Sequence, residues 1–231
     1  MKKTLFLLLF ITQFIFSQKQ WFTTYADSIA LVKDANTITE KFTKDLKKIS
    51  PTLQFEIKTV LNTTPYLIFF YKDAANIPLW EQVIPEQKQF FYELGGIETE
   101  GKRFFGLFFN GFYLPHELGH ALEFELHSQV EGSYQSEYLA NTIAILWWKK
   151  HYRNKELQQC YEAAKKMFAQ LPNPVPEGST IEDFFGKNYE EASQNPYVYG
   201  YLQFRQFIEI YEDKGLPDFD TFVQNLIKNK K

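Results

Sequence analysis

Residues 112–125 read FYLPHELGHALEFE, and the five letters HELGH at 116–120 decide how the rest of the chain is interpreted. His116 and His120 are four residues apart, so on a helix they lie on one face with their Cβ atoms about 6 Å apart. Two imidazoles at that spacing can reach one zinc ion. Glu117 is placed to reach a water beside the metal, as a general base must. The pattern predicts a zinc-binding helix over 112–125.

A third protein ligand is expected on the next helix, because a catalytic zinc is usually held by three protein side chains. Glu137 follows His120 by 17 residues, on a helix predicted for 136–151. If the two helices pack antiparallel, its carboxylate points back at the metal. Asn141 lies one turn further on the same face, where it can accept the ring N–H of His116 and so fix that ring's tautomer.

HELGH at 116–120 together with EYLAN at 137–141 resembles the gluzincin zinc peptidases, whose third ligand is a glutamate on the helix after HExxH. The resemblance implies one Zn²⁺ held by His116, His120 and Glu137, with Glu117 as general base in peptide-bond hydrolysis. It also implies a zincin-like fold, with a small N-terminal sheet on the HExxH helix and a mostly helical C-terminal part. Thermolysin-like members carry Asp where this chain has Asn141, which makes that position neutral here.

The rest of the chain predicts an α+β fold in which residues 18–231 form one domain. Apolar spacings of three and four predict a helix over 28–49, and alternation predicts a half-buried strand over 53–59. Two apolar runs, 66–71 and 103–110, are interpreted as further strands. The remaining segments are predicted as helices from 86 to the glycines at 95 and 96, over 155–170, 195–213 and 218–228, and as a proline-rich loop over 171–178.

The N-terminus has the order of a secretory signal peptide. Lys2 and Lys3 precede an apolar run over 5–16, and Ser17 is the predicted cleavage position. The run is too short for a membrane-spanning helix, which needs roughly 20 apolar residues. These features predict export to the periplasm or the medium, and no membrane span in the mature chain.

Charge and cysteine content narrow the classes of partner. The formal net charge is -3, and basic residues cluster only at the extreme C-terminus, so nucleic acid is a poor candidate partner. A peptide or protein substrate is expected instead. Cys160, the single cysteine, cannot form an internal disulfide and is expected to be a buried apolar residue.

Two further groups are weaker candidates for contact with the substrate. Tyr197 and Tyr201 share a face of the helix predicted from Asn195, where they could donate to an oxyanion, and Arg205 continues that face toward a substrate carboxylate. In a chain with 24 Phe and 14 Tyr, core packing explains such rings more simply. The strand predicted over 103–110 would, by the resemblance, offer an edge to an extended peptide.

Two other readings stay open. The first is a zincin-fold protein that binds zinc or a partner without turnover, against which the intact Glu117 argues. The second is an exported, aromatic-rich interaction module in which HExxH is incidental, and this reading predicts no stoichiometric zinc.

Overall fold

The N-terminal part of the chain forms a small sheet beside a long helix. The computed structural model describes residues 21–127 and 134–229. Helix α1 (Ser28–Ile49) is followed by β1 (Lys58–Leu61), β2 (Phe69–Tyr71) and β3 (Ala74–Ile77), and the strand order in the sheet is β1-β3-β2. β1 pairs with β3 in parallel, and β2 pairs with β3 antiparallel.

Helix α1 covers the outer edge of β1. The Asn36 amide pairs with the backbone of Thr59, accepting its N–H at 3.0 Å and donating to its carbonyl at 2.8 Å. The outer edge of β1 is therefore satisfied by a helix side chain. β2 forms the opposite edge of the sheet, and its Phe70 ring lies 6.3 Å from that of Phe124, near the end of the HExxH helix.

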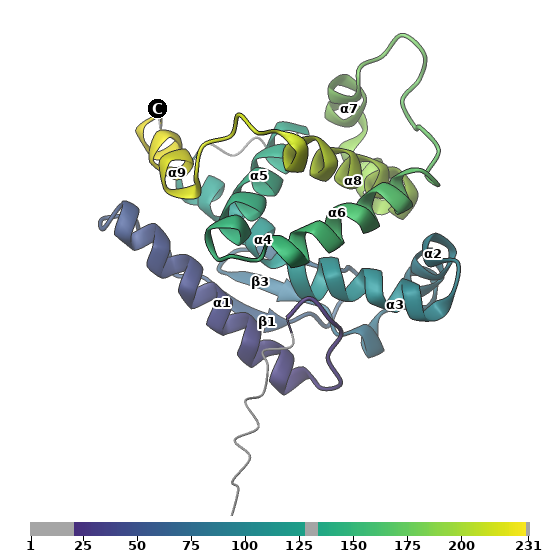
Figure 1. The fold of residues 1–231 in the computed structure, drawn as a ribbon, viewed down its shortest axis with the longest axis horizontal. Helices are drawn as coiled ribbons and strands as arrows, with labels where there is room; N and C mark the ends of the chain where they lie inside the picture. Colours follow the sequence, from purple (N-terminus) through teal and green to yellow (C-terminus); the bar gives the residue numbers. More distant parts are fainter. Residues whose placement is uncertain (1–20, 128–133, 230–231) are drawn as a thin grey trace, which may run out of the picture.

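The rest of the described chain is helical. Figure 1 shows α4 between the sheet and the helices α5, α6 and α8. The bounds of these elements are 3₁₀ helix Trp80–Gln82, α2 Pro85–Gly95, α3 Glu98–Leu107, π-helical turn Phe108–Phe112, α4 Tyr113–Glu125, α5 Tyr134–Lys150, α6 Asn154–Phe168, α7 Ile181–Gln194, α8 Pro196–Glu212 and α9 Phe219–Lys228. The structure is thus mixed α+β and mostly helical, as predicted at that level.

A single apolar cluster extends from Trp21 to Val223 and accounts for much of the aromatic content. Phe42 illustrates how it joins the elements, since its ring lies 5.7 Å from Trp147 of α5 and 5.8 Å from Phe219 of α9. Cys160 is fully buried, as expected.

Most of the predicted helices are confirmed, and their ends have local causes. α1 begins after Asp27, whose side chain accepts the Ala30 N–H at 2.8 Å. α2 ends at Gly96, which has a φ of 79°, a left-handed conformation that glycine adopts without strain. α8 begins after Asn195, whose side chain accepts the Tyr197 N–H at 3.0 Å.

The strand predicted over 103–110 is wrong, because this segment belongs to α3 and the π-helical turn. Residues 104–108 are all buried, so the apolar run itself shows no 3.6-residue period, although Lys102 and Arg103 just before it lie at the surface. A short apolar run of this kind does not distinguish a buried helix from a buried strand.

The other strand predictions hold only in part. Pairing begins at Lys58, so residues 53–57 are not in a strand, although Leu53 and Phe55 are buried. In the 66–71 run only Phe69–Tyr71 pair, and they lie half-exposed at the sheet edge rather than buried beside the first strand. Sequence reasoning missed β3, which is only four residues long, and α7, whose helical pattern is interrupted by Gly186 and by the non-helical Asn188.

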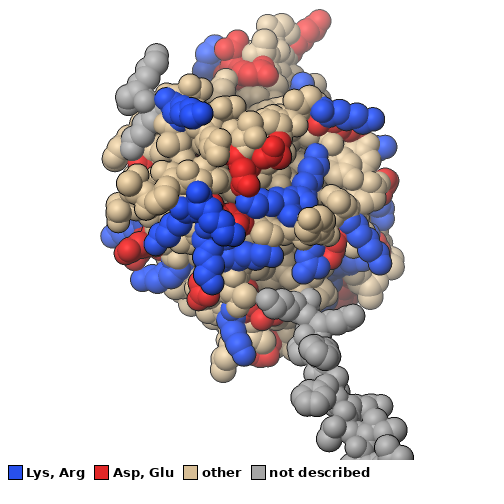
Figure 2. Space-filling model, turned by 60° about the vertical axis from the view of Figure 1, so that its left-hand side comes forward, with Lys and Arg blue, Asp and Glu red and all other residues tan. Residues whose placement is uncertain are grey.

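The surface mixes charges of both signs. Figure 2 shows basic and acidic side chains intermingled on one face of the molecule. Exposed pairs include Lys102 with Glu81 at 3.2 Å and Arg205 with Glu209 at 2.7 Å. Within residues 21–127 and 134–229, no helix combines the length and apolar character needed to cross a membrane. The predicted signal peptide, 1–17, lies outside the described residues.

Candidate metal centre

Helix α4, which carries both histidines, starts from a turn that is hydrogen-bonded to the N-terminal segment. The π-helical turn before α4 contains Asn110, which has non-helical dihedral angles of φ -110° and ψ 26°. The carbonyls of Asn110 and Gly111 accept the Phe22 N–H at 2.9 Å and the Trp21 Nε1–H at 3.0 Å. The N-terminal segment thus satisfies carbonyls at this turn and helps to fix where α4 begins.

Helices α4 and α5 approach each other closely at Gly119. A Cβ placed on Gly119 would lie 3.1 Å from Cα of Ala140, so a larger residue would push the helices apart. Glu137 is in the first turn of α5, three residues before this contact, and is therefore held beside α4.

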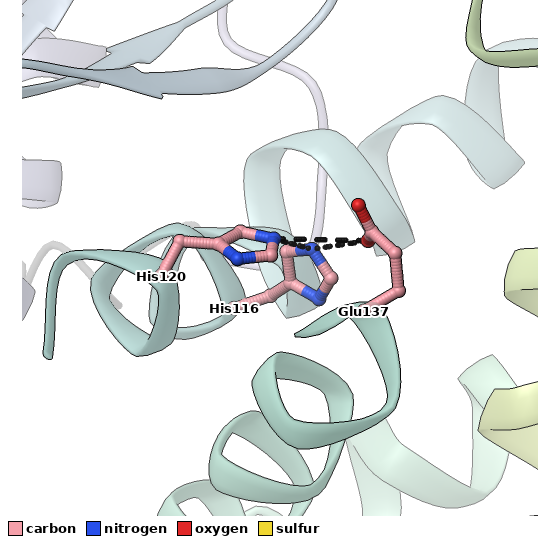
Figure 3. A group of neighbouring side chains, drawn as sticks. All are labelled: His116, His120 and Glu137. Atoms are coloured by element: carbon pink, nitrogen blue, oxygen red, sulfur yellow. Dashed lines mark hydrogen bonds and ion pairs between the residues drawn. The ribbon is translucent and has the colours of Figure 1, made fainter. Parts of the chain in front are cut away.

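Two imidazole nitrogens and one carboxylate oxygen converge between α4 and α5, as Figure 3 shows. Glu137 Oε2 lies 3.3 Å from Nε2 of His116 and 3.7 Å from Nε2 of His120. The two Nε2 atoms are 3.1 Å apart. The group is buried and can hold a metal ion.

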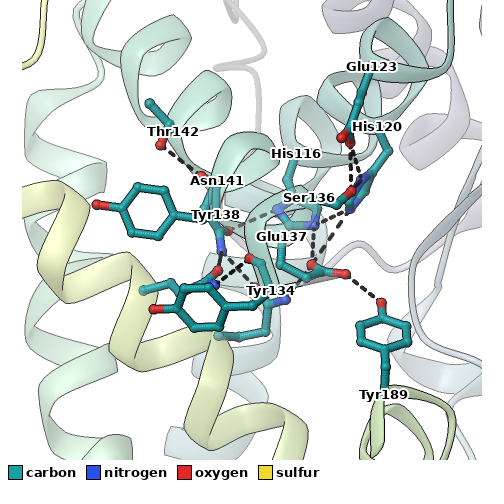
Figure 4. A network of polar contacts seen from close by, with 12 residues as sticks. His116, His120, Glu123, Tyr134, Ser136, Glu137, Tyr138, Asn141, Thr142 and Tyr189 are labelled. Carbon is teal, nitrogen blue, oxygen red and sulfur yellow. Dashed lines mark hydrogen bonds and ion pairs between the residues drawn. The ribbon is translucent and has the colours of Figure 1, made fainter. Parts of the chain in front are cut away.

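The tautomer of His116 is fixed by an amide network, drawn in Figure 4. Asn141 Nδ2 donates to Oε1 of Gln203 and of Gln206, each at 3.0 Å, which leaves Asn141 Oδ1 facing His116 Nδ1 at 2.9 Å. An amide oxygen only accepts, so His116 carries its proton on Nδ1 and turns the Nε2 lone pair toward Glu137. Gln206 Nε2 donates to the Tyr134 carbonyl at 3.0 Å and completes the network.

His120 is oriented by different chemistry. Ser136 Oγ donates to Glu123 Oε2 at 2.6 Å and lies 3.4 Å from His120 Nδ1. Because a carboxylate only accepts, the hydroxyl proton points to Glu123, and the hydroxyl oxygen can accept from His120 Nδ1–H. His120 then also presents an Nε2 lone pair. The Nδ1 atom of His116 therefore faces a neutral amide, Asn141, whereas the Nδ1 atom of His120 faces Ser136, which is itself bound to the buried carboxylate of Glu123.

Three electron-rich atoms at these distances repel one another unless a cation lies among them. In the metal-free protein that cation is a proton. Burial acts to lower the pKa of His120, but the Glu137 charge and the hydrogen bonds to Glu123 and Glu137 outweigh it and raise the pKa to about 10. Burial likewise acts to raise the pKa of Glu137, and the two histidines hold it well below its ordinary value.

Metal binding is expected to release about one proton per chain near neutral pH, because the His120 proton must leave before Nε2 can bind a metal. The affinity should rise with pH as long as the pH is below the metal-free pKa of about 10. It should fall by about tenfold for each unit by which the pH is lowered. Titration calorimetry in buffers of different ionisation enthalpy measures the release directly. Binding with no proton release would contradict the role of His120.

Glu117 lies beside this group and is not one of its three members. Its side chain is buried, and burial raises its pKa, an effect that the charges of His116 and His120 partly offset. The backbone of Phe70, in the edge strand β2, contributes a further lowering of the pKa. Glu117 therefore lies on the side of α4 that faces the edge strand β2.

Tyr197, Tyr201 and Arg205 are placed elsewhere. The Tyr197 hydroxyl donates to Glu93 of α2, the Tyr201 ring packs 4.8 Å from Phe168, and Arg205 Nε donates to Glu209 at 2.7 Å. These contacts are with groups outside the three metal-binding side chains, and the roles predicted for the three residues at an oxyanion or a substrate carboxylate stay predictions.

The face of α8 that reaches the site is instead formed by Tyr199, Gln203 and Gln206. Gln203 Nε2 donates to Glu137 Oε2 at 2.6 Å, and loss of hydration together with the Glu137 charge raises the pKa of Tyr199. Their spacing of four and three residues was visible in the sequence. The sequence did not show which face of α8 is turned toward the metal group. Gln203, Gln206, Ser136 and Tyr189 were not predicted as site residues, and Tyr189 has no local signal, because its contact with Glu137 joins distant helices.

Comparisons with models of protein families, with curated proteins and with solved structures gave no match for this chain. The chemistry of the cluster itself must therefore indicate what the site does. Two oriented imidazoles and one carboxylate, of which His116 and Glu137 are buried and His120 is partly exposed, form a donor set for a divalent transition metal.

Proposed function

We propose that this chain is an exported zinc-dependent peptidase of the gluzincin type, with a zincin-like fold. The observation that carries the proposal is the convergence of His116, His120 and Glu137 on one point, with the HExxH glutamate beside them. Three electron-rich atoms within 4.8 Å of one another need a cation, and two imidazoles with one carboxylate are a set that zinc enzymes use. Export rests on the predicted signal peptide alone.

The residues present fit zinc in number and in orientation. Both histidines have a partner at Nδ1 that leaves Nε2 free to bind, and the Glu137 carboxylate balances one positive charge. When bound, zinc would supply a Lewis acid that activates water and polarises a carbonyl.

Glu117 is the residue that would move the proton. In peptide hydrolysis it would take a proton from the attacking water at its carboxylate and pass it to the leaving amine nitrogen. Burial supports this role, because the raised pKa of Glu117 brings the carboxylate closer to the pH at which it must both accept and release a proton.

The free edge of the sheet supports a peptide substrate. The segment first expected to pair with substrate, 103–110, is helical, whereas β2 is an edge strand next to α4. An extended peptide could add to β2 as a further strand, because edge strands expose unpaired N–H and C=O groups. The Phe70 backbone near Glu117 would bring such a peptide beside the proposed base.

One observation favours a second function, zinc binding without turnover. His116 is only 2% exposed and Glu137 only 3%, which is the burial of a structural site. His120, with 14% of its side chain exposed, is the ligand most open to solvent. Because the described metal group has three members, one coordination position remains for water or substrate, and this favours the catalytic reading.

Metal analysis combined with a cleavage assay on the purified chain 18–231 separates these possibilities. We expect close to one zinc per chain and cleavage of a mixed peptide library that a chelator stops and added zinc restores. Stoichiometric zinc without cleavage would favour the binding protein. A folded chain that takes up no zinc would overturn both readings and leave HExxH as an incidental motif.

A further inference from the structure

The two oxygens of the Glu137 carboxylate have different surroundings. Oε2 faces the two histidine Nε2 atoms and accepts from Gln203 at 2.6 Å. Oε1 accepts from the Tyr189 hydroxyl at 2.5 Å. Tyr189 reaches the carboxylate from α7, a helix distant in sequence from both α4 and α5, as Figure 4 shows.

The helix that carries Tyr189 has few other anchors. Of its residues only Ile181, Phe185 and Ala192 are buried. Asn188, directly before Tyr189, is non-helical with φ -125° and ψ 18°, and its side chain donates to the Phe184 carbonyl at 2.7 Å. The irregularity in α7 therefore lies next to the residue that contacts the metal group. The bond from Tyr189 to Glu137 therefore adds to the packing of Ile181, Phe185 and Ala192 in holding α7 against the metal group.

We propose that Tyr189 is a positioning residue that holds Glu137 by Oε1, so that Oε2 is turned toward the metal, and that it couples α7 to the metal centre. The inference rests on the proposed zinc site but not on peptide hydrolysis.

The physical basis is the freedom of a carboxylate that lacks such a partner. The terminal torsion of a glutamate is broad, so a carboxylate held only by Gln203 at Oε2 can still rotate away from the orientation seen here. A hydroxyl bound to one oxygen at 2.5 Å is a short, charge-assisted hydrogen bond that opposes this rotation. The Tyr199 side chain supports the arrangement, because it is hydrogen-bonded to the Tyr189 side chain.

The first test compares Tyr189→Phe with the matched control Tyr161→Phe. The Tyr161 hydroxyl also donates to a glutamate of another helix, Glu212, but at the surface. We expect zinc affinity, measured by competition with a chromophoric chelator, to fall about 10- to 100-fold in Tyr189→Phe and to stay unchanged in the control. The visible absorption of the cobalt-substituted chain should change in Tyr189→Phe alone, because it reports the ligand arrangement and not stability.

The second test follows α7 by hydrogen exchange of residues 181–194 with and without zinc. Zinc should slow exchange across α7 in the parent and in Tyr161→Phe, and should have a much smaller effect in Tyr189→Phe. Equal zinc affinity, an unchanged cobalt spectrum and the same zinc effect on α7 in all three chains would overturn the role of Tyr189, while the proposed function would stand. A parent that binds no zinc would overturn the metal centre itself, and the inference with it.

Discussion

Replacement of Glu117 by glutamine is expected to slow peptide hydrolysis severely while zinc binding stays close to that of the parent. The carboxylate is not among the three converging ligand groups, so its loss leaves the metal group complete. Glutamine has nearly the same shape but cannot accept the proton of an attacking water. General bases contribute about 10²- to 10⁴-fold to rate, so kcat/KM should fall by about 10³-fold. Initial cleavage rates and metal content, measured on the same preparations, check both parts.

Glu125→Gln is the matched control for this variant. Glu125 is on the same helix and is not part of the metal group, and its replacement by glutamine removes the same negative charge. Its rate should stay close to that of the parent. If Glu117→Gln cleaves peptides as fast as the control does, Glu117 is not the base, even if the chain is a zinc peptidase.

Replacement of Glu137 by alanine is expected to weaken zinc binding by at least about 100-fold. Structural zinc sites with four ligands bind with about 10–16 kcal/mol, so one ligand contributes roughly 3 kcal/mol, which corresponds to more than 100-fold. Zinc affinity by chelator competition is the measurement. Cleavage at limiting zinc should fall in parallel.

The alanine variant also removes the acceptor for Gln203 and Tyr189, so a loss of stability has to be separated from a loss of a ligand. Glu137→Gln keeps the size of the side chain but removes its charge, and it should also bind zinc more weakly than the parent. Glu86→Ala changes an exposed glutamate of α2 and should bind as the parent does. Parent-like zinc affinity in both Glu137 variants would show that the third ligand lies elsewhere.

Local signals in the sequence account for what could be predicted of the fold. The spacing of apolar residues in α1, the side-chain caps at Asp27 and Asn195, and Gly96 at the end of α2 all act within one or two turns. The four-residue separations of His116 from His120 and of Glu137 from Asn141 are of the same kind. Because a helix has a fixed period, such pairs share a face wherever the helix lies.

Segments buried on every side did not reveal their structure in this way. Residues 104–107 are all buried in α3, so this stretch shows no alternation of buried and exposed positions that would distinguish a helix from a strand. β3 exists because β1 and β2 pair on either side of it, which is a long-range condition. The segment in which an edge for peptide pairing was expected, 103–110, is accordingly helical.

Helix periodicity alone indicates the helix that carries His116 and His120, the place of Glu117 between them and the shared face of Glu137 and Asn141. Packing between helices brings these groups together, places Gln203 and Tyr189 on the carboxylate, and gives Tyr197, Tyr201 and Arg205 contacts with Glu93, Phe168 and Glu209. The physical reason is that the period of a helix specifies which residues share a face, whereas the direction of that face is set by packing against elements distant in the chain.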